Sequence, residues 1–224
     1  MNDYTNKKAL FIRELRRWYH KNRRYYPWRD TKNPYEILIS EYFLQKTNAD
    51  LALATYTKFI KNYPSPRSLA RASLIKVNRL ISSIGLSYRA ERLNKAAKQL
   101  VNEFGGKVPD NRKDLLKLYG IGLYISNAVL CFAYNKRVAI IDTNTIRIFG
   151  RVFGIKSNLK RPRTDTNLER QIELFLPIKN SREFNYALLD FGATICTAKR
   201  PKCDYCPLNT LCIYYREVAS QIPA

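Results

Sequence analysis

The chain has 224 residues, which suits one large domain or two small ones and is long enough to bury a core without disulfides. Apolar residues make up 46% and charged residues 26%, a globular balance that argues against a disordered or fibrous chain. Forty Lys and Arg against 18 Asp and Glu leave a net charge of +22, well above the roughly 2–8 that keeps a small domain soluble. So strong a positive field favours a polyanion, most commonly nucleic acid.

Two other classes of protein are disfavoured by the same inspection. A basic chain can also bind an anionic membrane, but the sequence has no apolar run of about 18 residues. Residues 1–5 contain no apolar signal core, so secretion is not expected. The single histidine, His20, lies in a basic stretch, where we expect a solvated helical position rather than a catalytic triad or a multi-histidine metal site.

Most of the chain predicts helices, because apolar residues recur with a period near 3.6. The first helix contains Leu10, Leu15 and Trp18. Further helices are expected at 35–46, 50–62, 74–81, 89–104, 113–118, 124–134, 144–153, 168–175 and 182–195. Most of the prolines fall between these segments, where helices should end. Only 137–141 resembles a strand, and five residues make no sheet, so the fold class is mainly α.

Four cysteines near the C-terminus form the most specific local pattern. They are Cys196, Cys203, Cys206 and Cys212, separated by six, two and five residues. Four soft thiolates at this spacing can wrap one metal centre. Structural zinc usually uses two Cys-x-x-Cys pairs, whereas a four-iron cluster bound by four cysteines tolerates uneven loops, so spacing alone leaves both open. Two disulfides would need an oxidising compartment. The fifth cysteine, Cys131, is expected to be a buried apolar residue.

Two further segments suit phosphate groups. Lys199, Arg200 and Lys202 lie between the first two cysteines, on a loop that metal ligands would pin at both ends. These cations could contact DNA phosphates, neutralise the thiolates, or do both.

Separately, residues 118–122 read Leu-Tyr-Gly-Ile-Gly between two predicted helices. A tight turn with Gly120, Ile121 and Gly122 would present backbone N–H groups at a helix start, where they suit a phosphate oxygen.

Together the glycine hairpin, the following Ile-Ile-Asp-Thr-Asn and the four-cysteine tail resemble the helix-hairpin-helix DNA glycosylases. That family includes endonuclease III, adenine DNA glycosylase and the thymine–guanine mismatch glycosylases, and its four-iron cluster pattern has the same cysteine spacing. The resemblance covers nearly the whole chain. Further similar motifs lie at 26–29, 33–35, 39–41, 44–47, 84–87, 89–91 and 184–192.

The resemblance implies two helical lobes with a DNA-binding cleft between them. Residues 30–137 would form a six-helix barrel that carries the hairpin, and 1–29 with 138–224 would form a lobe with a [4Fe-4S] cluster at 196–212. The expected partner is double-stranded DNA containing a mismatch, from which one nucleotide is flipped into the cleft. We expect a monomer in the cytoplasm, associated with the nucleoid.

The resemblance also assigns catalytic roles. Asp142 would stabilise the oxocarbenium-like sugar, while its position also predicts a helix N-cap, where the helix dipole lowers the pKa of a carboxylate. Glu41 matches an acid that protonates the departing base, although on a helix it would otherwise be interpreted as a surface residue. Tyr124 stands where strand-cleaving relatives carry a Schiff-base Lys, which predicts a monofunctional enzyme that leaves an abasic site.

Other matched positions concern DNA distortion and the choice of base. Gln45 and Tyr88 are candidates for a wedge inserted into the base stack, and Tyr119 replaces the usual hairpin proline. The motifs favour thymine or uracil opposite guanine as the base removed. The alternatives are an adenine glycosylase acting opposite guanine or 8-oxoguanine, and a non-catalytic DNA-binding iron–sulfur protein. The presence of Asp142 argues against the second of these.

Overall fold

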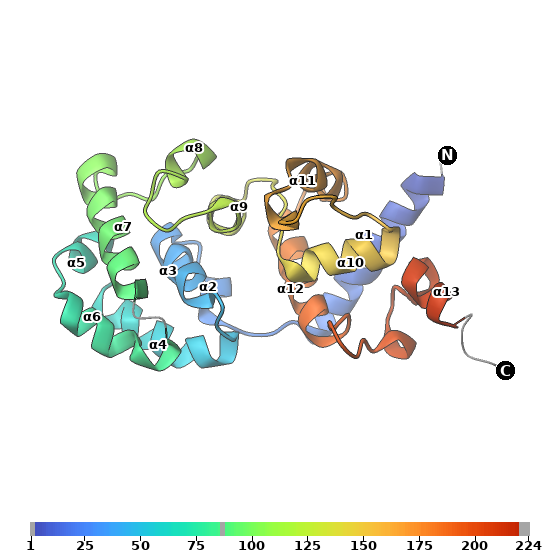
Figure 1. Cartoon of the computed structure of the whole chain (residues 1–224), viewed down its shortest axis with the longest axis horizontal. Coiled ribbons are helices and arrows are strands. Elements are labelled where there is room, and N and C mark those ends of the chain that lie inside the picture. The colour runs from blue at the N-terminus through green and yellow to red at the C-terminus, as the bar shows by residue number, and fades with distance from the viewer. Residues whose placement is uncertain (1–2, 86–87, 220–224) are drawn as a thin grey trace. The chain divides into compact units, whose positions relative to one another are not determined.

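A computed structural model describes residues 3–85 and 88–219. Within these ranges the protein contains helices and no β-strand, which confirms the mainly α prediction (Figure 1). The strand-like residues 137–141 belong to no helix and to no sheet. None of the described helices combines the length and apolar character needed to cross a bilayer.

The chain divides into two compact units. Unit 2 is Tyr25–Tyr134, and unit 1 contains the described residues up to Arg24 and from Asn135 onward. The boundaries expected from the sequence fall between residues 29 and 30 and between residues 137 and 138, so the two divisions differ by a few residues at each crossing.

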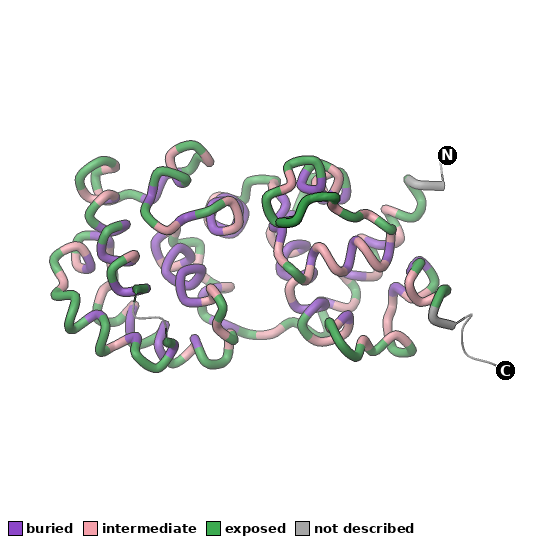
Figure 2. The backbone as a smooth tube through the Cα atoms, in the orientation of Figure 1, coloured by how far each residue is buried: buried purple, intermediate pink, exposed green. Residues whose placement is uncertain are grey.

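Unit 2 is organised around one enclosed helix, α3. The elements of the unit are α2 (Pro27–Asp30), α3 (Pro34–Leu44), α4 (Ala49–Asn62), α5 (Pro66–Ala70), α6 (Leu74–Ile81), η1 (Ser82–Ile84), α7 (Tyr88–Phe104), α8 (Arg112–Leu115) and α9 (Leu123–Phe132). Helix α3 packs against α2, α4, α7 and α9, and Figure 2 shows it almost wholly buried. It begins where Asn33 caps the Tyr35 N–H at 3.0 Å and Pro34 fits the first helical position.

Unit 1 is built around α12. Its elements are α1 (Asp3–Asn22), α10 (Thr143–Phe153), η2 (Pro162–Thr164), α11 (Thr166–Glu173), α12 (Ser181–Thr194), η3 (Cys203–Tyr205), η4 (Asn209–Leu211) and α13 (Ile213–Ala219). Helix α12 packs against both α1 and α10 (Figure 1). Phe11 is fully buried at the centre of an aromatic cluster, with its ring 5.5 Å from Phe149 and 6.0 Å from Phe184. His20 is exposed on α1, as predicted.

The predicted helices are present with small shifts at their ends, but some short elements were missed. Helices α2, α5 and α13 and the 3₁₀ turns are too short to show an apolar period. The helix expected at 113–118 ends at Leu115, because the chain then turns toward Gly120. The helix expected at 124–134 ends at Phe132, shortly before Asn135, which has a left-handed φ of 54°.

Candidate functional site

The glycine hairpin joins α8 to α9 in unit 2. Gly120 has φ +80°, and a Cβ there would lie 3.2 Å from Arg92 Cδ and 3.3 Å from Tyr42 Cε1, so both conformation and space require glycine. The Ile121 side chain is buried, and its N–H donates to the Leu118 carbonyl at 3.1 Å. Gly122 is the N-cap of α9 and offers no side chain to cap it. The arrangement suits an anion at the start of α9.

Tyr119 binds the hairpin to its unit in a way that proline could not. Its N–H donates to Gln99 Oε1 at 2.7 Å, and its carbonyl accepts from the Tyr42 hydroxyl. Proline has no N–H and would lose the first of these bonds. The Lys95 ammonium lies 4.6 Å from the centre of the exposed Tyr119 ring. Proline at this position would stiffen the turn, whereas Tyr119 instead fixes it through a hydrogen bond to Gln99 of α7.

Asp142 ends an extended segment that α12 holds in place. Asn185 of α12 accepts from the Ile140 N–H at 3.3 Å and donates to the Val138 carbonyl at 3.1 Å. Asp142 is the N-cap of α10, as predicted: its Oδ1 accepts from the Thr145 N–H at 2.7 Å. Its Oδ2 accepts from Asn144 Nδ2 at 2.8 Å. Both carboxylate oxygens are thus fixed, and the side chain keeps part of its surface exposed.

The expected pKa of Asp142 was wrong in direction. Burial among protein atoms raises the pKa above the ordinary Asp value, and the hydrogen bonds from Thr145 and Asn144 lower it only in part. The cap of α11, Asp165, shows the opposite balance. It is half-buried, and hydrogen bonds from Ser157, Leu168 and Asn167 outweigh the effect of burial and hold its pKa below the ordinary value. A helix start lowers a carboxyl pKa only where desolvation does not outweigh it.

Three residues that were not predicted from the sequence support Asp142. Arg147 donates to Asn144 Oδ1 at 2.7 Å, to the Gly192 carbonyl at 2.8 Å and to the Cys196 carbonyl at 2.7 Å. A Cβ at Gly192 would overlap the Asn144 side chain. Part of the signal was present in the sequence, since Arg147 follows Asn144 by three residues and a glycine inside a helix often marks close packing.

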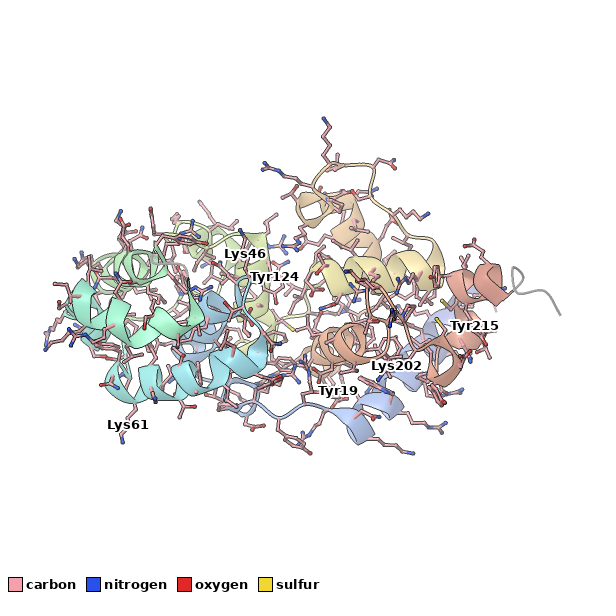
Figure 3. All side chains as sticks on the ribbon, turned by 60° about the horizontal axis from the view of Figure 1, so that its bottom comes forward. Tyr19, Lys46, Lys61, Tyr124, Lys202 and Tyr215 are labelled. Carbon is pink, nitrogen blue, oxygen red and sulfur yellow. The ribbon has the colours of Figure 1, made fainter. Side chains whose placement is uncertain are left out.

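Glu41 and Tyr124 occupy different environments in unit 2. Glu41 lies on α3 with 3% of its surface exposed, so its interpretation as a surface residue was wrong. The reason is that α3 is enclosed on all sides, which no single-helix pattern reveals. Tyr124 is the second residue of α9, directly after the hairpin, and is half-buried (Figure 3).

The two wedge candidates lie at the ends of helices. Gln45 follows the last residue of α3 and is half-buried, while Tyr88 begins α7 and is 38% exposed. The Arg92 guanidinium lies 4.3 Å from the centre of the Tyr88 ring. Leu86 and Ser87, which precede Tyr88 in the matched loop, lie outside the described residues.

The four C-terminal cysteines line one cavity in unit 1. Its walls also include Arg151, Lys202 and Tyr215. Cys196 and Cys212 are buried, Cys203 and Cys206 are half-buried, and none forms a disulfide. In the described residues, no group of three or more His, Cys, Asp or Glu side chains is arranged around a single-ion position. Cys131 is fully buried on α9, as predicted.

The donor set of this cavity, and not its charge in the metal-free state, fits a metal centre. Burial, followed by neighbouring sulfurs, raises the pKa of Cys206 to about 12, and burial also raises the pKa of Cys203 and Cys212, so these three groups favour the thiol form. A metal centre reverses that preference, because a coordinated thiol is deprotonated. Arg151 already supplies one cation, with Nη1 3.5 Å from Cys196 Sγ. The four-thiol donor set around one cavity fits an iron–sulfur cluster.

The cations of the cysteine segment are exposed. Lys199, Arg200 and Lys202 all face solvent, and the Lys202 side chain leaves the loop that follows α12 (Figure 3). The loop is held at its base, where Arg151 donates to the Thr197 carbonyl at 2.7 Å and to the Ala198 carbonyl at 2.9 Å. Charged side chains on a tethered loop can meet phosphates at little cost in chain entropy.

Comparison with known proteins identifies the family. Residues 39–176 match the HhH-GPD superfamily of base excision DNA repair proteins, and the chain belongs to that family. It is 37% identical to a thymine/uracil-DNA glycosylase from Methanothermobacter thermautotrophicus, over 98% of this chain and 100% of the relative. A thymine-DNA glycosylase from Aeropyrum pernix is 40% identical, over 84% of this chain and 86% of the relative. The resemblance drawn from the sequence is confirmed.

Solved structures agree with this placement. A thermostable thymine-DNA glycosylase superposes with a TM-score of 0.91 at 35% identity, over 96% of this chain and all of that one. A trapped endonuclease III–DNA covalent intermediate superposes with a TM-score of 0.83 over 98% of this chain, and at 22% identity it shows the shared fold alone.

Proposed function

We propose that this protein is a monofunctional DNA glycosylase that hydrolyses the N-glycosidic bond of thymine or uracil paired with guanine and leaves an abasic site. The family and the relatives of nearly equal length, which are named thymine or thymine/uracil-DNA glycosylases, support the reaction class. The observation that carries the proposal is the Asp142 carboxylate, whose two oxygens are both held at the start of α10.

Asp142 acts on the sugar. Departure of the base leaves positive charge on the deoxyribose, and a fixed carboxylate in a partly desolvated position stabilises that charge without reorganising. Because Thr145 and Asn144 already hold the two oxygens, the carboxylate cannot rotate away as charge develops. Solvent still reaches part of the side chain, which leaves room for a sugar or a water molecule beside it.

Glu41 acts on the departing base. A buried carboxylic acid can donate a proton in the transition state, an effect worth ~10²–10⁴-fold. Thymine and uracil leave as anions more readily than adenine does, so we expect Glu41 to contribute less here than it would to adenine removal. Tyr124 has no amine and cannot form a Schiff base with the sugar, so the reaction stops at the abasic site.

Double-stranded DNA with a mismatch is the proposed partner, bound by a monomer. The N–H groups at the start of α9 would bind one phosphate, and Lys199, Arg200 and Lys202 would bind others. Cys196, Cys203, Cys206 and Cys212 would hold a [4Fe-4S] cluster, which when bound cross-links this segment and adds a redox-capable centre. The net charge of +22 supports a phosphate-dominated interaction.

The test compares two aspartates with the same capping role. Asp142→Asn should abolish release of thymine from a T·G duplex while DNA binding is retained. Asp165→Asn is the matched control, because Asp165 caps α11 through its carboxylate in the same unit. Equal activity of the two variants would remove Asp142 from the reaction.

A panel of duplexes separates the alternatives. T, U, A and hypoxanthine are each paired with G and with 8-oxoguanine, and alkali-sensitive cleavage is measured. Preference for adenine would favour the adenine glycosylase alternative, which is supported by relatives such as that of Buchnera aphidicola, 37% identical over 93% of this chain and 60% of the relative. Tight binding without cleavage of any duplex would favour the non-catalytic DNA-binding alternative. Borohydride should trap no covalent adduct between the enzyme and DNA, because Tyr124 has no amine that could form a Schiff base with the sugar.

The raised pKa of Asp142 predicts a pH dependence. Only the carboxylate form stabilises a cation, so single-turnover base release should fall as the pH drops through a value above the ordinary Asp pKa. Stability changes in the opposite sense. The folded state favours the protonated form more than the unfolded state does, so this contribution is complete below the unfolded-state pKa and is lost as the pH rises through the folded-state pKa. Rate and urea-unfolding profiles of wild type and Asp142→Asn measure both effects.

A further inference from the structure

Arg89, the second residue of α7, is a buried cation with an unusual set of partners. Its guanidinium has no exposed surface, although arginine is rarely buried in full. It donates to the Gln45 carbonyl at 2.6 Å, to the Ile84 carbonyl at 3.2 Å and to Thr47 Oγ1 at 3.1 Å. Within residues 3–85 and 88–219, no carboxylate pairs with it.

Burying this guanidinium has a cost that its position must offset. Desolvation disfavours the charged form and lowers the pKa of Arg89, and three neutral acceptors around its two terminal nitrogens replace only part of the water that it loses, since its buried Nε has no partner among the described residues. These acceptors belong to two segments that are far apart in the sequence. Gln45 and Thr47 lie in the turn between α3 and α4, and Ile84 ends the turn before α7. One side chain therefore joins the two turns.

The α3–α4 turn needs such support because its backbone is strained. Lys46 has φ 56°, a left-handed conformation that non-glycine residues rarely adopt, and it is exposed at the end of α3 (Figure 3). The turn is closed weakly by its own atoms, with the Thr47 N–H 3.4 Å from the Leu44 carbonyl. The shorter bond from Arg89 to the Gln45 carbonyl fixes the residue just before the strained one.

Arg92, one turn later on α7, extends the connection to the hairpin. Its guanidinium lies over the Tyr88 ring, and its Cδ lies 3.2 Å from the position that a Cβ on Gly120 would take. The first two turns of α7 thus contact the turn between α3 and α4 through Arg89 and the glycine hairpin through Arg92, and Arg92 also holds the Tyr88 ring at the start of the helix. All these segments belong to unit 2, so one rigid element fixes their spacing.

We infer that Arg89 is a positioning residue for base flipping. It holds the turn between α3 and α4, which carries Gln45, at a fixed separation from the 3₁₀ turn that ends at Ile84 and from Tyr88 at the start of α7, as a base stack with one everted nucleotide requires. The inference rests on the proposed function, because it assumes that Gln45 and Tyr88 enter the stack. Arg89 is buried and reaches the DNA only through these turns. Preorganised wedges lower the cost of eversion, because the protein need not order them on binding.

The test replaces Arg89 by Met, which keeps the apolar stem and removes the donors. The matched control is Asn94→Ala. Asn94 is also buried on α7 and donates to main-chain carbonyls, those of Leu69 and Ala72, but it ties α7 to α5 instead of to the wedge turns. We expect Arg89→Met to lower single-turnover release of thymine by ~10–100-fold, the scale of a small misplacement. It should also reduce the fluorescence increase of a 2-aminopurine placed beside the mismatch.

Four readouts separate positioning from a general loss of stability. Affinity for a fully paired duplex should stay within about twofold, because phosphate contacts outside the two turns dominate it. The rate defect should shrink on a duplex whose target base is already unpaired, since less eversion remains to be assisted. Arg89→Lys should restore part of the rate by keeping a donor. Hydrogen exchange of residues 44–48 should accelerate in Arg89→Met and not in Asn94→Ala.

If Arg89→Met and Asn94→Ala show the same rate, fluorescence and exchange, the positioning role is overturned while the proposed function stands. If wild type neither everts nor releases a base from any duplex, the proposed function fails and this role with it. If Arg89→Met does not fold, Thr47→Val removes one acceptor at nearly constant shape. That variant should show a smaller defect of the same kind, and wild-type kinetics in it would count against the inference.

Discussion

The glycine hairpin and the cysteine segment 196–212 are both proposed to contact DNA, but they are held in different ways. The hairpin is complete with protein atoms alone: Gln99 and Tyr42 bind its backbone, and Gly120 supplies the one left-handed residue. The cysteine segment contains only two short 3₁₀ turns, and its base is bound by arginines of α10.

The difference shows which loops require a ligand. The hairpin backbone is positioned by hydrogen bonds that need no ligand, whereas the cysteine segment brings four soft donors to one cavity, where a metal centre would link them. Burial, followed by the neighbouring sulfurs, holds the pKa of Cys206 and Cys212 above the ordinary thiol value. We therefore expect the hairpin to be present in the metal-free protein and the cysteine segment to depend on the proposed cluster.

Removing the cluster should have the largest effect. Cys206→Ser, or chelation of iron, should abolish the brown colour, remove hydrogen-exchange protection across 196–212 and weaken DNA binding by at least about tenfold, since the segment would no longer hold its cations against several phosphates. Protection of 118–126 should be unchanged. Cys131→Ala is the control, because Cys131 is buried on α9 in unit 2 and does not line the cavity. A colourless wild-type protein with one equivalent of zinc would contradict the iron–sulfur assignment.

Neutralising the exposed cations of the segment should have the next largest effect. The combined change Lys199→Gln, Arg200→Gln and Lys202→Gln should reduce the slope of log affinity against log salt by about 0.9 for each phosphate that the protein no longer neutralises. The cluster absorption should be retained. Lys58→Gln with Lys61→Gln on α4 is the control for net charge. If the slope of log affinity against log salt changes equally per removed charge in both variants, the loop contributes only through the net charge of the protein.

Gly120→Ala should affect both stability and binding. The alanine would be left-handed and pressed against Arg92 and Tyr42, so the free energy of unfolding should fall by about 1–2 kcal/mol. DNA affinity should fall as well. Gly105→Ala is the control. Gly105 has a similar positive φ of 62°, and a Cβ there would meet open space, so the substitution strains the backbone outside the hairpin. If Gly105→Ala weakens DNA binding as much, the hairpin has no special role.

Gly122→Ala should have the smallest effect on stability. It therefore separates a loss of DNA affinity from a loss of folding free energy. Its φ is −108° and a Cβ there meets nothing within 4 Å, so the urea-unfolding midpoint should hardly change. A methyl group at the cap of α9 would nevertheless stand where a phosphate approaches. We expect weaker DNA binding at unchanged stability, measured by titration with a fluorescent duplex. Undiminished affinity would place the phosphate elsewhere.

Much of the fold and several site residues follow from local patterns. Helix periods and prolines located the longer helices, and Asp142 was correctly expected to cap α10. The burial of Glu41 was missed, because it depends on α2, α4, α7 and α9 packing around α3. The support of Asp142 by Arg147 and Gly192 was missed for the same reason, since it joins α10 to α12.

The sequence by itself determined the helical class, the family, the four-cysteine donor set and the position of the capping carboxylate, since each depends on residue types at short separations. Only the tertiary structure decided how those groups behave. Asp142 and Asp165 are both caps, yet burial raises the pKa of one and hydrogen bonds lower that of the other. Desolvation depends on atoms brought together from distant parts of the chain, and no local pattern contains that information.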